Sequence, residues 1–288
     1  WPAKFRDQLQ GGIPRRYLAI DIETSGFKAG EDVVTEIGHV LVEDGNVLDK
    51  ASTLLDWTNH PIVKPGWLRE RLVRVGNAMA DYSLDGINAY HITFDSMQER
   101  GLPPEQVFQQ YISLIEKFKD SDFYIVGHNH TQFDENMLRD NIVGFKFGKD
   151  FDFGQNVFDT NAMERAIQFF EAEDLKALPA ASETPRGYFY RMTFTKMRDR
   201  QKTQSKLRYC MDKYELRELC KDEQSCLHSA EFDAFVCHLL MQRWHKMDQD
   251  SDVPPPSALP PVEAPVRERK TRSPLPSVLT RYRGQRNR

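Results

Sequence analysis

The chain has 288 residues, of which 40% are hydrophobic and 28% are charged, an ordinary composition for a soluble globular protein. The length allows one large domain or two small ones. No apolar run approaches the ~20 residues that a helix needs to cross a bilayer, which argues against a membrane-spanning protein.

Three strands are predicted before residue 56. Residues 17–22 form an apolar run typical of a buried strand. Residues 33–42 and 47–55 flank the pair Asp44-Gly45, and an Asp-Gly pair between apolar runs indicates a hairpin. We therefore expect at least two antiparallel neighbours in one sheet.

Helices and further short strands are predicted after this meander. Apolar residues recur at three-to-four spacing after Pro103-Pro104, which predicts a helix over residues 103–119. A short buried strand at 123–126 follows. Further helices are predicted over residues 133–142, 158–171, 213–220 and 230–244. Strands that alternate with helices in this way favour a mixed α/β sheet.

Charge and proline content set the C-terminal segment apart. Residues 251–288 carry eight Lys and Arg against three Asp and Glu, and they hold eight of the sixteen prolines. The net charge of −4 therefore divides into an acidic body and a basic tail. We expect this tail to be disordered, and either a solvated linker or an arm that binds nucleic acid or a partner.

Two carboxylates end the first predicted strand. Side chains at positions i and i+2 share one face of a strand, so Asp21 and Glu23 project together. Adjacent carboxylates repel, and a cation between them relieves that repulsion. Asp134 and Asp233 lie in contexts that could complete the cluster. Taken singly each signal is weak, because an Asp that opens a helix is usually only a cap.

Taken together and in order, these residues resemble the DEDDh 3′–5′ exonucleases. That group includes proofreading subunits of bacterial replicative DNA polymerases, ribonuclease T and oligoribonucleases. Its three motifs resemble Asp21-Ile22-Glu23-Thr24-Ser25-Gly26, His128-Asn129 through Phe133-Asp134 with one extra spacer residue, and His228-Ser229-Ala230-Glu231-Phe232-Asp233-Ala234. Glu36-Ile37-Gly38, His91-Ile92-Thr93 and Asp159-Thr160 fit lesser marks.

The resemblance implies a fold and a domain plan. The fold would be ribonuclease H-like, a mixed five-stranded α/β sheet with helices on both faces, insertions and a disordered C-terminal tail. Its domain would span residues 15–248, between an N-terminal extension of residues 1–14 and the Pro-rich basic tail of residues 249–288. Relative to compact members, inserts are expected at about residues 57–88 and 172–212.

The resemblance also implies two Mg²⁺ or Mn²⁺ ions as cofactors. Two such ions activate water and neutralise the leaving 3′-oxygen of a phosphodiester. Asp21 would bridge both ions, Glu23 and Asp233 would hold the ion at the nucleophile, and Asp134 would act on the other through water. His228 is the candidate general base, because its unperturbed pKa of ~6.5 suits proton abstraction near pH 7.

Two groups of residues are candidates for substrate binding. Thr24 and Gly26 would let the backbone approach the terminal nucleotide, and His91 and Phe133 would wall or stack its base. His128 and Asn129 are expected to support the second motif.

Residues 186–208 hold eight basic residues and one acidic residue, with Tyr188, Tyr190, Met192 and Phe194 alternating as in a strand. Arg198, Arg200 and Lys202 are candidates there, either to grip a single strand or to pack on the acidic body.

The resulting hypothesis is a metal-dependent 3′–5′ exonuclease that releases nucleoside monophosphates, with single-stranded DNA slightly favoured over RNA. The alternatives are a catalytically inactive nucleic-acid-binding scaffold on the same fold and a polymerase-associated module that docks a replication partner through its tail. The four cysteines form no C-x-x-C pair, so we expect free thiols in a reducing compartment, cytoplasmic or nucleoid-associated.

Overall fold

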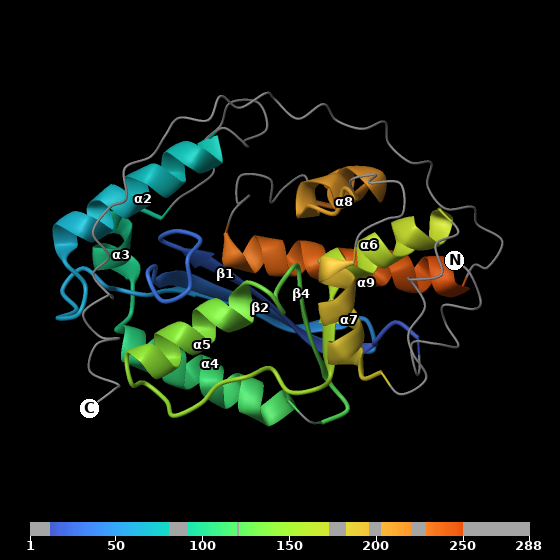
Figure 1. Ribbon diagram of the computed structural model, residues 1–288, viewed down its shortest axis with the longest axis horizontal. Helices are drawn as coiled ribbons and strands as arrows, with labels where there is room; N and C mark the ends of the chain where they lie inside the picture. The colour runs from blue at the N-terminus through green and yellow to red at the C-terminus, as the bar shows by residue number, and fades with distance from the viewer. Residues whose placement is uncertain are drawn as a thin grey trace.

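A five-stranded sheet forms the centre of the protein. The computed structural model describes residues 12–80, 92–119, 121–172, 183–195, 203–220 and 229–249. Its strand order is β3-β2-β1-β4-β5 (Figure 1). The strands are β1 (Arg16–Thr24), β2 (Val34–Glu43), β3 (Asn46–Leu54), β4 (Tyr124–Gly127) and β5 (Val157–Asp159). The first three pair antiparallel, and β1, β4 and β5 pair parallel. The predicted mixed five-stranded α/β sheet is confirmed.

Helices pack on both faces of the sheet, as the sequence predicted. They are α2 (Pro65–Ala80), α3 (Phe94–Arg100), α4 (Pro104–Phe118), α5 (Asp134–Gly144), α6 (Thr160–Glu171), α7 (Pro185–Phe194), α8 (Leu207–Lys213) and α9 (Ala230–Gln249). The predicted helices at 103–119, 133–142 and 230–244 correspond to α4, α5 and α9. The helix predicted from residue 158 begins at Thr160, because Asp159 ends β5 and caps α6 by accepting from the Asn161 and Ala162 backbone N–H groups.

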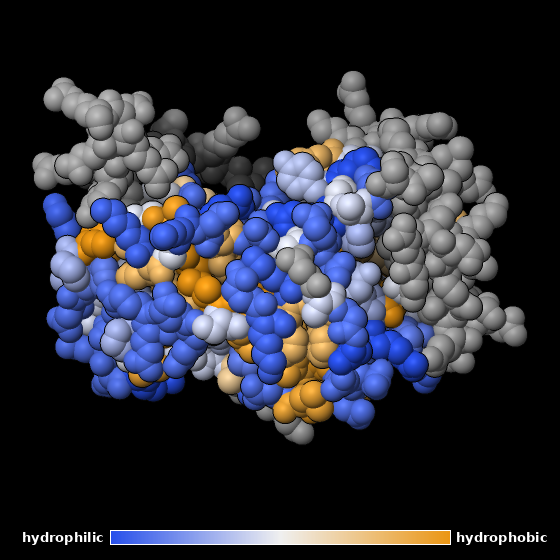
Figure 2. Space-filling model, turned by 90° about the horizontal axis from the view of Figure 1, so that it is seen from below, coloured by the Kyte–Doolittle hydropathy of each residue, from blue (hydrophilic) through white to orange (hydrophobic). Residues whose placement is uncertain are grey.

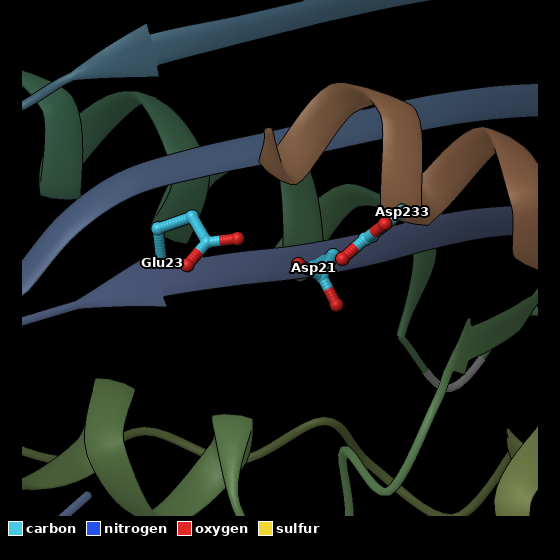
Figure 3. A group of neighbouring side chains, drawn as sticks. All are labelled: Asp21, Glu23 and Asp233. Atoms are coloured by element: carbon cyan, nitrogen blue, oxygen red, sulfur yellow. The ribbon is translucent and has the colours of Figure 1, made fainter. Parts of the chain in front are cut away.

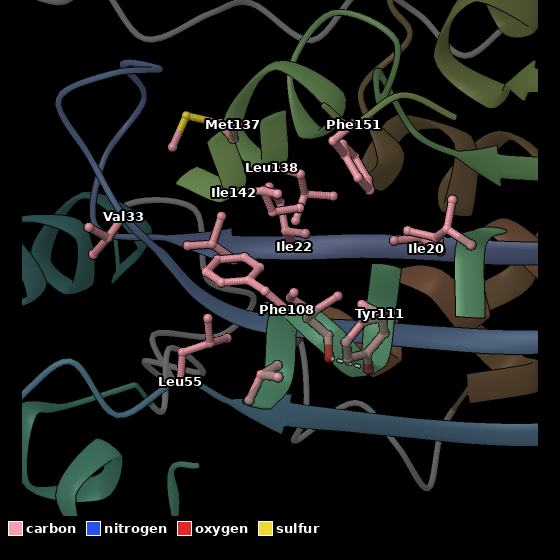
Figure 4. Packing of buried hydrophobic residues seen from close by; sticks show 14 of the residues in the cluster. Ile20, Ile22, Val33, Leu55, Phe108, Tyr111, Met137, Leu138, Ile142 and Phe151 are labelled. Carbon is pink, nitrogen blue, oxygen red and sulfur yellow. Dashed lines mark hydrogen bonds between the residues drawn. The ribbon is translucent and has the colours of Figure 1, made fainter. Parts of the chain in front are cut away.

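The period of two along β1 divides the core into two clusters. Leu18, Ile20 and Ile22 pack with α4 and α5 on one face. Figure 4 shows Ile20 and Ile22 in this cluster. Tyr17 and Ala19 pack with α6, α7 and α9 on the other. Asp21 and Glu23 continue the row of Tyr17 and Ala19, so they project from the face that α9 covers.

The strand predicted at residues 188–194 is wrong, because these residues belong to helix α7. Thr184 caps it by accepting from the Gly187 N–H, and Pro185 occupies its first turn. Tyr188 and Met192 are buried one helical turn apart, while Tyr190 and Phe194 are exposed and pair their rings at 5.1 Å. Alternate positions along the sequence thus fall on opposite sides of a helix.

The helix predicted over residues 213–220 is also misplaced. The α-helix there is α8, which ends at Lys213, and residues 216–220 form only a short 3₁₀ turn. Glu215 separates them with a φ of 57°, a left-handed conformation that cannot continue an α-helix. Periodicity alone could not predict this break.

Seen from below, the surface is mostly hydrophilic, with hydrophobic areas between the polar side chains (Figure 2). Such isolated apolar areas are usual on globular proteins. Among the helices of the described ranges, none combines the length and the apolar character that crossing a bilayer requires.

Candidate active site

Three carboxylates from two distant segments meet at the end of β1. Asp21 and Glu23 project from β1, and Asp233 projects from the first turn of α9 (Figure 3). One oxygen atom from each lies within 4.8 Å of the others. Oxygen atoms at this spacing can share a hard divalent cation. The predicted pairing of Asp21 and Glu23 on one face is confirmed, and α9 adds the third acid.

A glycine makes this approach of α9 possible. Gly38 of β2 lies opposite Asp21 in the sheet register. A Cβ atom at residue 38 would lie only 2.2 Å from the Ala230 carbonyl carbon and the Glu231 nitrogen. The beginning of α9 therefore rests directly on the backbone of β2. A side chain at residue 38 would push Asp233 away from Asp21.

Glu36, two residues earlier on β2, fixes the same helix end. Its Oε2 atom accepts from the Ala230 N–H at 3.0 Å, and its Oε1 atom accepts from the Ser52 hydroxyl at 2.7 Å. It thereby satisfies one of the free N–H groups at the start of α9. In the sequence, Glu36 stood out only as a lesser mark of the family, and this role was not predicted. The three-residue run Glu36-Ile37-Gly38 was the available signal.

The fourth acid, Asp134, reaches the site from the parallel neighbour of β1. It is the first residue of α5, which follows β4 and a short loop. Asp159 organises that loop by accepting from the backbone N–H groups of Asn129 at 3.0 Å and Thr131 at 3.3 Å. Asn129 itself has a φ of 66°, a conformation that Asn adopts more readily than most residues. Asp159 therefore holds the loop that leads into Asp134.

The four acids line one pocket with a volume of about 170 Å³. Its walls come from β1, the loop after β1, α2, the loop after β4, α5 and α9. The lining residues are Asp21, Ile22, Glu23, Thr24, Phe27, Val75, His128, Phe133, Asp134 and Asp233. The structure thus gathers residues of all three motifs, Asp21 and Glu23, Asp134, and Asp233, into one cavity.

Burial and mutual repulsion raise the pKa of these acids. Burial is the main cause for Asp21, whose pKa lies well above its usual value, and the carboxylates of Asp134 and Asp233 add to it. Burial likewise raises the pKa of Glu23, of Asp134 to about 8 and of Asp233 to about 7. Among the described groups that perturb Asp21, Glu23 and Asp233 there is no cation. The residues therefore fit a divalent cation, which would supply the missing positive charge.

His128 lies at the pocket wall as a neutral ring. Its Nε2 atom lies 3.3 Å from the Asn161 amide nitrogen, and its Nδ1 atom lies 3.0 Å from the Thr160 hydroxyl, which itself donates to the Gly127 carbonyl. Burial lowers the pKa of His128 to about 4. These contacts suit the supporting role that the sequence analysis gave His128.

The other predicted binding residues fall into two groups. Thr24 and Phe133 line the pocket. Gly26 is not among the lining residues. The absence of a side chain at Gly26 makes room for Asp32, because a Cβ atom at residue 26 would lie only 2.4 Å from the Asp32 carboxylate. The candidate base His228 lies outside the described residues. So do His91, Arg198, Arg200 and Lys202.

Two pocket residues were missed by the sequence analysis. Phe27 is 66% exposed, and its ring lies 6.3 Å from that of Phe133. Val75 reaches the pocket from α2, which lies in the predicted insert of residues 57–88. An apolar residue directly after the first motif was a signal for Phe27. No local pattern could identify Val75.

Known proteins were compared with the sequence and with the structure. No protein-family model matches the sequence. The chain is 31% identical over 123 residues to the PolC-type DNA polymerase III of Pediococcus pentosaceus, a stretch that covers 43% of this chain and 6% of the polymerase. The fold is similar to that of E. coli exonuclease I in complex with a dT13 oligonucleotide, with a TM-score of 0.49, 15% identity and coverage of 82% of this chain and 42% of the other. A zinc-bound complex of E. coli exonuclease I with single-stranded DNA gives a TM-score of 0.48, 15% identity and coverage of 82% and 41%. This chain thus spans less than half the length of each of these proteins.

Proposed function

We propose that this chain is a metal-dependent 3′–5′ exonuclease of the DEDDh type. The observation that carries the proposal is the convergence of Asp21, Glu23, Asp134 and Asp233 on one pocket. The order of these acids along the chain, and the elements that present them, agree with the family motifs. The match to part of a DNA polymerase supports DNA over RNA as the substrate.

The carboxylates are the proposed ligands of two Mg²⁺ or Mn²⁺ ions. Asp21, at the centre of the group, would be shared, with Glu23 and Asp233 on one side and Asp134 on the other. When bound, the cations lower the pKa of water and neutralise charge on the leaving 3′-oxygen. The carboxylates must be ionised to bind them, so binding releases the protons that the raised pKa values retain.

His228 is the proposed general base. It directly precedes Ser229, whose hydroxyl accepts from the Phe232 N–H at 3.2 Å and whose carbonyl accepts from the Asp233 N–H at 3.0 Å. Ser229 therefore caps the helix that carries Asp233. A base immediately before this cap lies close to Asp233 along the chain, and its imidazole would take the proton of the attacking water.

The protein's remaining parts are proposed to serve this activity. Residues 15–248 form the exonuclease domain, with inserts at about 57–88 and 172–212, and residues 249–288 act as a basic arm for nucleic acid or a replication partner. A reducing compartment is proposed because Cys210 and Cys237 are buried thiols.

The test uses 5′-labelled single-stranded DNA, duplex DNA and RNA with Mg²⁺ or Mn²⁺. The wild type should give a ladder that shortens from the 3′ end, and both Asp21→Ala and His228→Ala should abolish it. Asp95→Ala is the matched control, because Asp95 lies in an exposed first turn of α3. Cleavage that persists in Asp21→Ala would refute the proposal. Tight binding by the wild type without any cleavage would favour the inactive scaffold.

A further inference from the structure

Helix α2 forms one wall of the pocket, although it lies in a segment longer than the compact members of the family require. Leu68, Leu72 and Val75 follow one another at helical spacing and are buried in the cluster that contains Ile22. Val75, the last of them, also lines the pocket. The apolar face that holds α2 on the body therefore reaches the carboxylates.

A buried ion pair fastens α2 to the loop after β1. The Nε atom of Arg71, one helical turn before Val75, lies 3.5 Å from the Oδ1 atom of Asp32. The exposed fractions of these side chains are 12% and 1%. A pair so far from water is screened much less than a surface pair.

Asp32 in turn organises the loop that carries Phe27. Its Oδ2 atom accepts from the Lys28 N–H at 3.0 Å, and its Oδ1 atom accepts from the Ser25 hydroxyl at 3.4 Å. The Ser25 N–H donates to the Val33 carbonyl at 2.9 Å and closes the loop. Arg71 thus couples α2 to the backbone between Glu23 and β2, and so to the exposed ring of Phe27.

The pocket between these walls is small. Its volume of about 170 Å³ lies below the ~300–1,000 Å³ typical of sites for drug-sized ligands. Val75 and the ring pair of Phe27 and Phe133 bound it together with the carboxylates. Such a space suits part of one unpaired nucleotide, and Val75 of α2 forms part of its wall.

We propose that α2 determines the substrate class by restricting the pocket to an unpaired 3′-terminal nucleotide. Val75 is the specificity-determining residue, and Arg71 is a positioning residue that acts through Asp32. This inference rests on the proposed exonuclease activity. A purely structural role of α2, as a cover for the core, would lower stability on mutation and leave the choice between single-stranded and paired ends unchanged.

The experiment measures the ratio of kcat/KM for a single-stranded 3′ end to kcat/KM for the same sequence in a blunt duplex. Val75→Ala should lower this ratio about tenfold, since a missing methylene in a pocket changes discrimination by roughly 10-fold or more. Val75→Phe should instead fill the pocket and weaken binding of the single strand. That binding is measured without cleavage by the fluorescence of a 3′-terminal 2-aminopurine in Ca²⁺. Val73→Ala is the control on the same helix, because Val73 is 63% exposed.

Arg71→Ala should raise KM for the single strand more than it lowers kcat, and Arg71→Lys should restore part of the loss. Arg74→Ala, which removes an exposed pair with Glu70, should change neither. Thermal unfolding of every variant verifies the fold, and Val75→Ile replaces Val75→Phe if the latter unfolds. An unchanged ratio in folded Val75→Ala, or equal cleavage of both ends by the wild type, would overturn the inference and leave the exonuclease proposal intact. A wild type that cleaves no substrate would instead refute the exonuclease proposal itself.

Discussion

Replacing Gly38 with alanine tests the central geometric claim about the site. The added Cβ atom would lie 2.2 Å from backbone atoms of Ala230 and Glu231, whereas carbon atoms in contact lie about 3.5–4.0 Å apart. Neither strand β2 nor the backbone of α9 can rotate out of the way as a side chain could. The beginning of α9 must therefore retreat by more than about 1 Å, and Asp233 retreats with it.

The expected cost has two parts. Displacing a catalytic group by about 1 Å lowers the rate by roughly 100-fold. Overpacking, with loss of the hydrogen bond from the Ala230 N–H to Glu36, lowers the free energy of unfolding by about 1–3 kcal/mol. The cation should consequently stabilise Gly38→Ala much less than it stabilises the wild type.

Two measurements check this prediction. One is kcat/KM on a labelled single-stranded oligonucleotide, and the other is the increase in Tm on addition of Mn²⁺. Gly144→Ala is the control, because a Cβ atom at that glycine meets no other atom within 4 Å. If Gly38→Ala keeps the activity and the Mn²⁺-induced increase in Tm of the wild type, α9 does not need this close contact to place Asp233.

Three further predictions concern stability. Burial raises the pKa of Asp134 to about 8 and of Asp233 to about 7, so these acids keep protons in the folded state that they lose in the unfolded chain. Burial also lowers the pKa of His128 and His238 to about 4, and this opposes the effect of the acids below pH ~6.5. Without metal, Tm should therefore fall as pH rises from about 6.5 to 8, and Mn²⁺ should raise it more at pH 8 than at pH 5.5. A Tm without metal that rises across this range would contradict the assignment. Asp159→Ala removes the acceptor of several buried N–H groups and should lower the free energy of unfolding in urea by about 3 kcal/mol, while Asp159→Asn should lose less. Lys213→Ala leaves the carboxylate of Glu164 buried without its partner at 2.9 Å and should lower the free energy of unfolding by about 3–5 kcal/mol. Adding Glu164→Gln removes the unpaired charge and should recover part of this loss. Equal stability of the single and double variants would indicate that the charge is not the cause.

The elements that carry the acids could be predicted from sequence because their signals are local. The period of two along residues 17–23 assigns Asp21 and Glu23 to one face of a strand whatever surrounds it. The apolar stripe after residue 230 predicts a helix with Asp233 in its first turn. The motif order then indicated that these segments belong together.

The errors arose where a local pattern fits two structures. Aromatic residues at alternate positions in residues 188–194 suit a strand, but the Thr184 cap and Pro185 begin a helix there. The α-helix expected at residues 213–220 does not form, because Glu215 in a left-handed conformation interrupts the chain after α8. Hydrophobic periodicity does not record such caps and breaks.

The sequence by itself determined the first four strands and the helices that carry Asp134 and Asp233, because each depends on neighbours along the chain. The five-stranded sheet and the set of four acids came from the resemblance to a family. The tertiary structure alone decided how close the acids come, since that distance depends on an absent side chain at Gly38 and on the hydrogen bond from Ala230 to Glu36. It also decided that Val75 of α2 lines the pocket. Contacts between segments far apart in sequence depend on how helices pack on the sheet, and no local pattern encodes that packing.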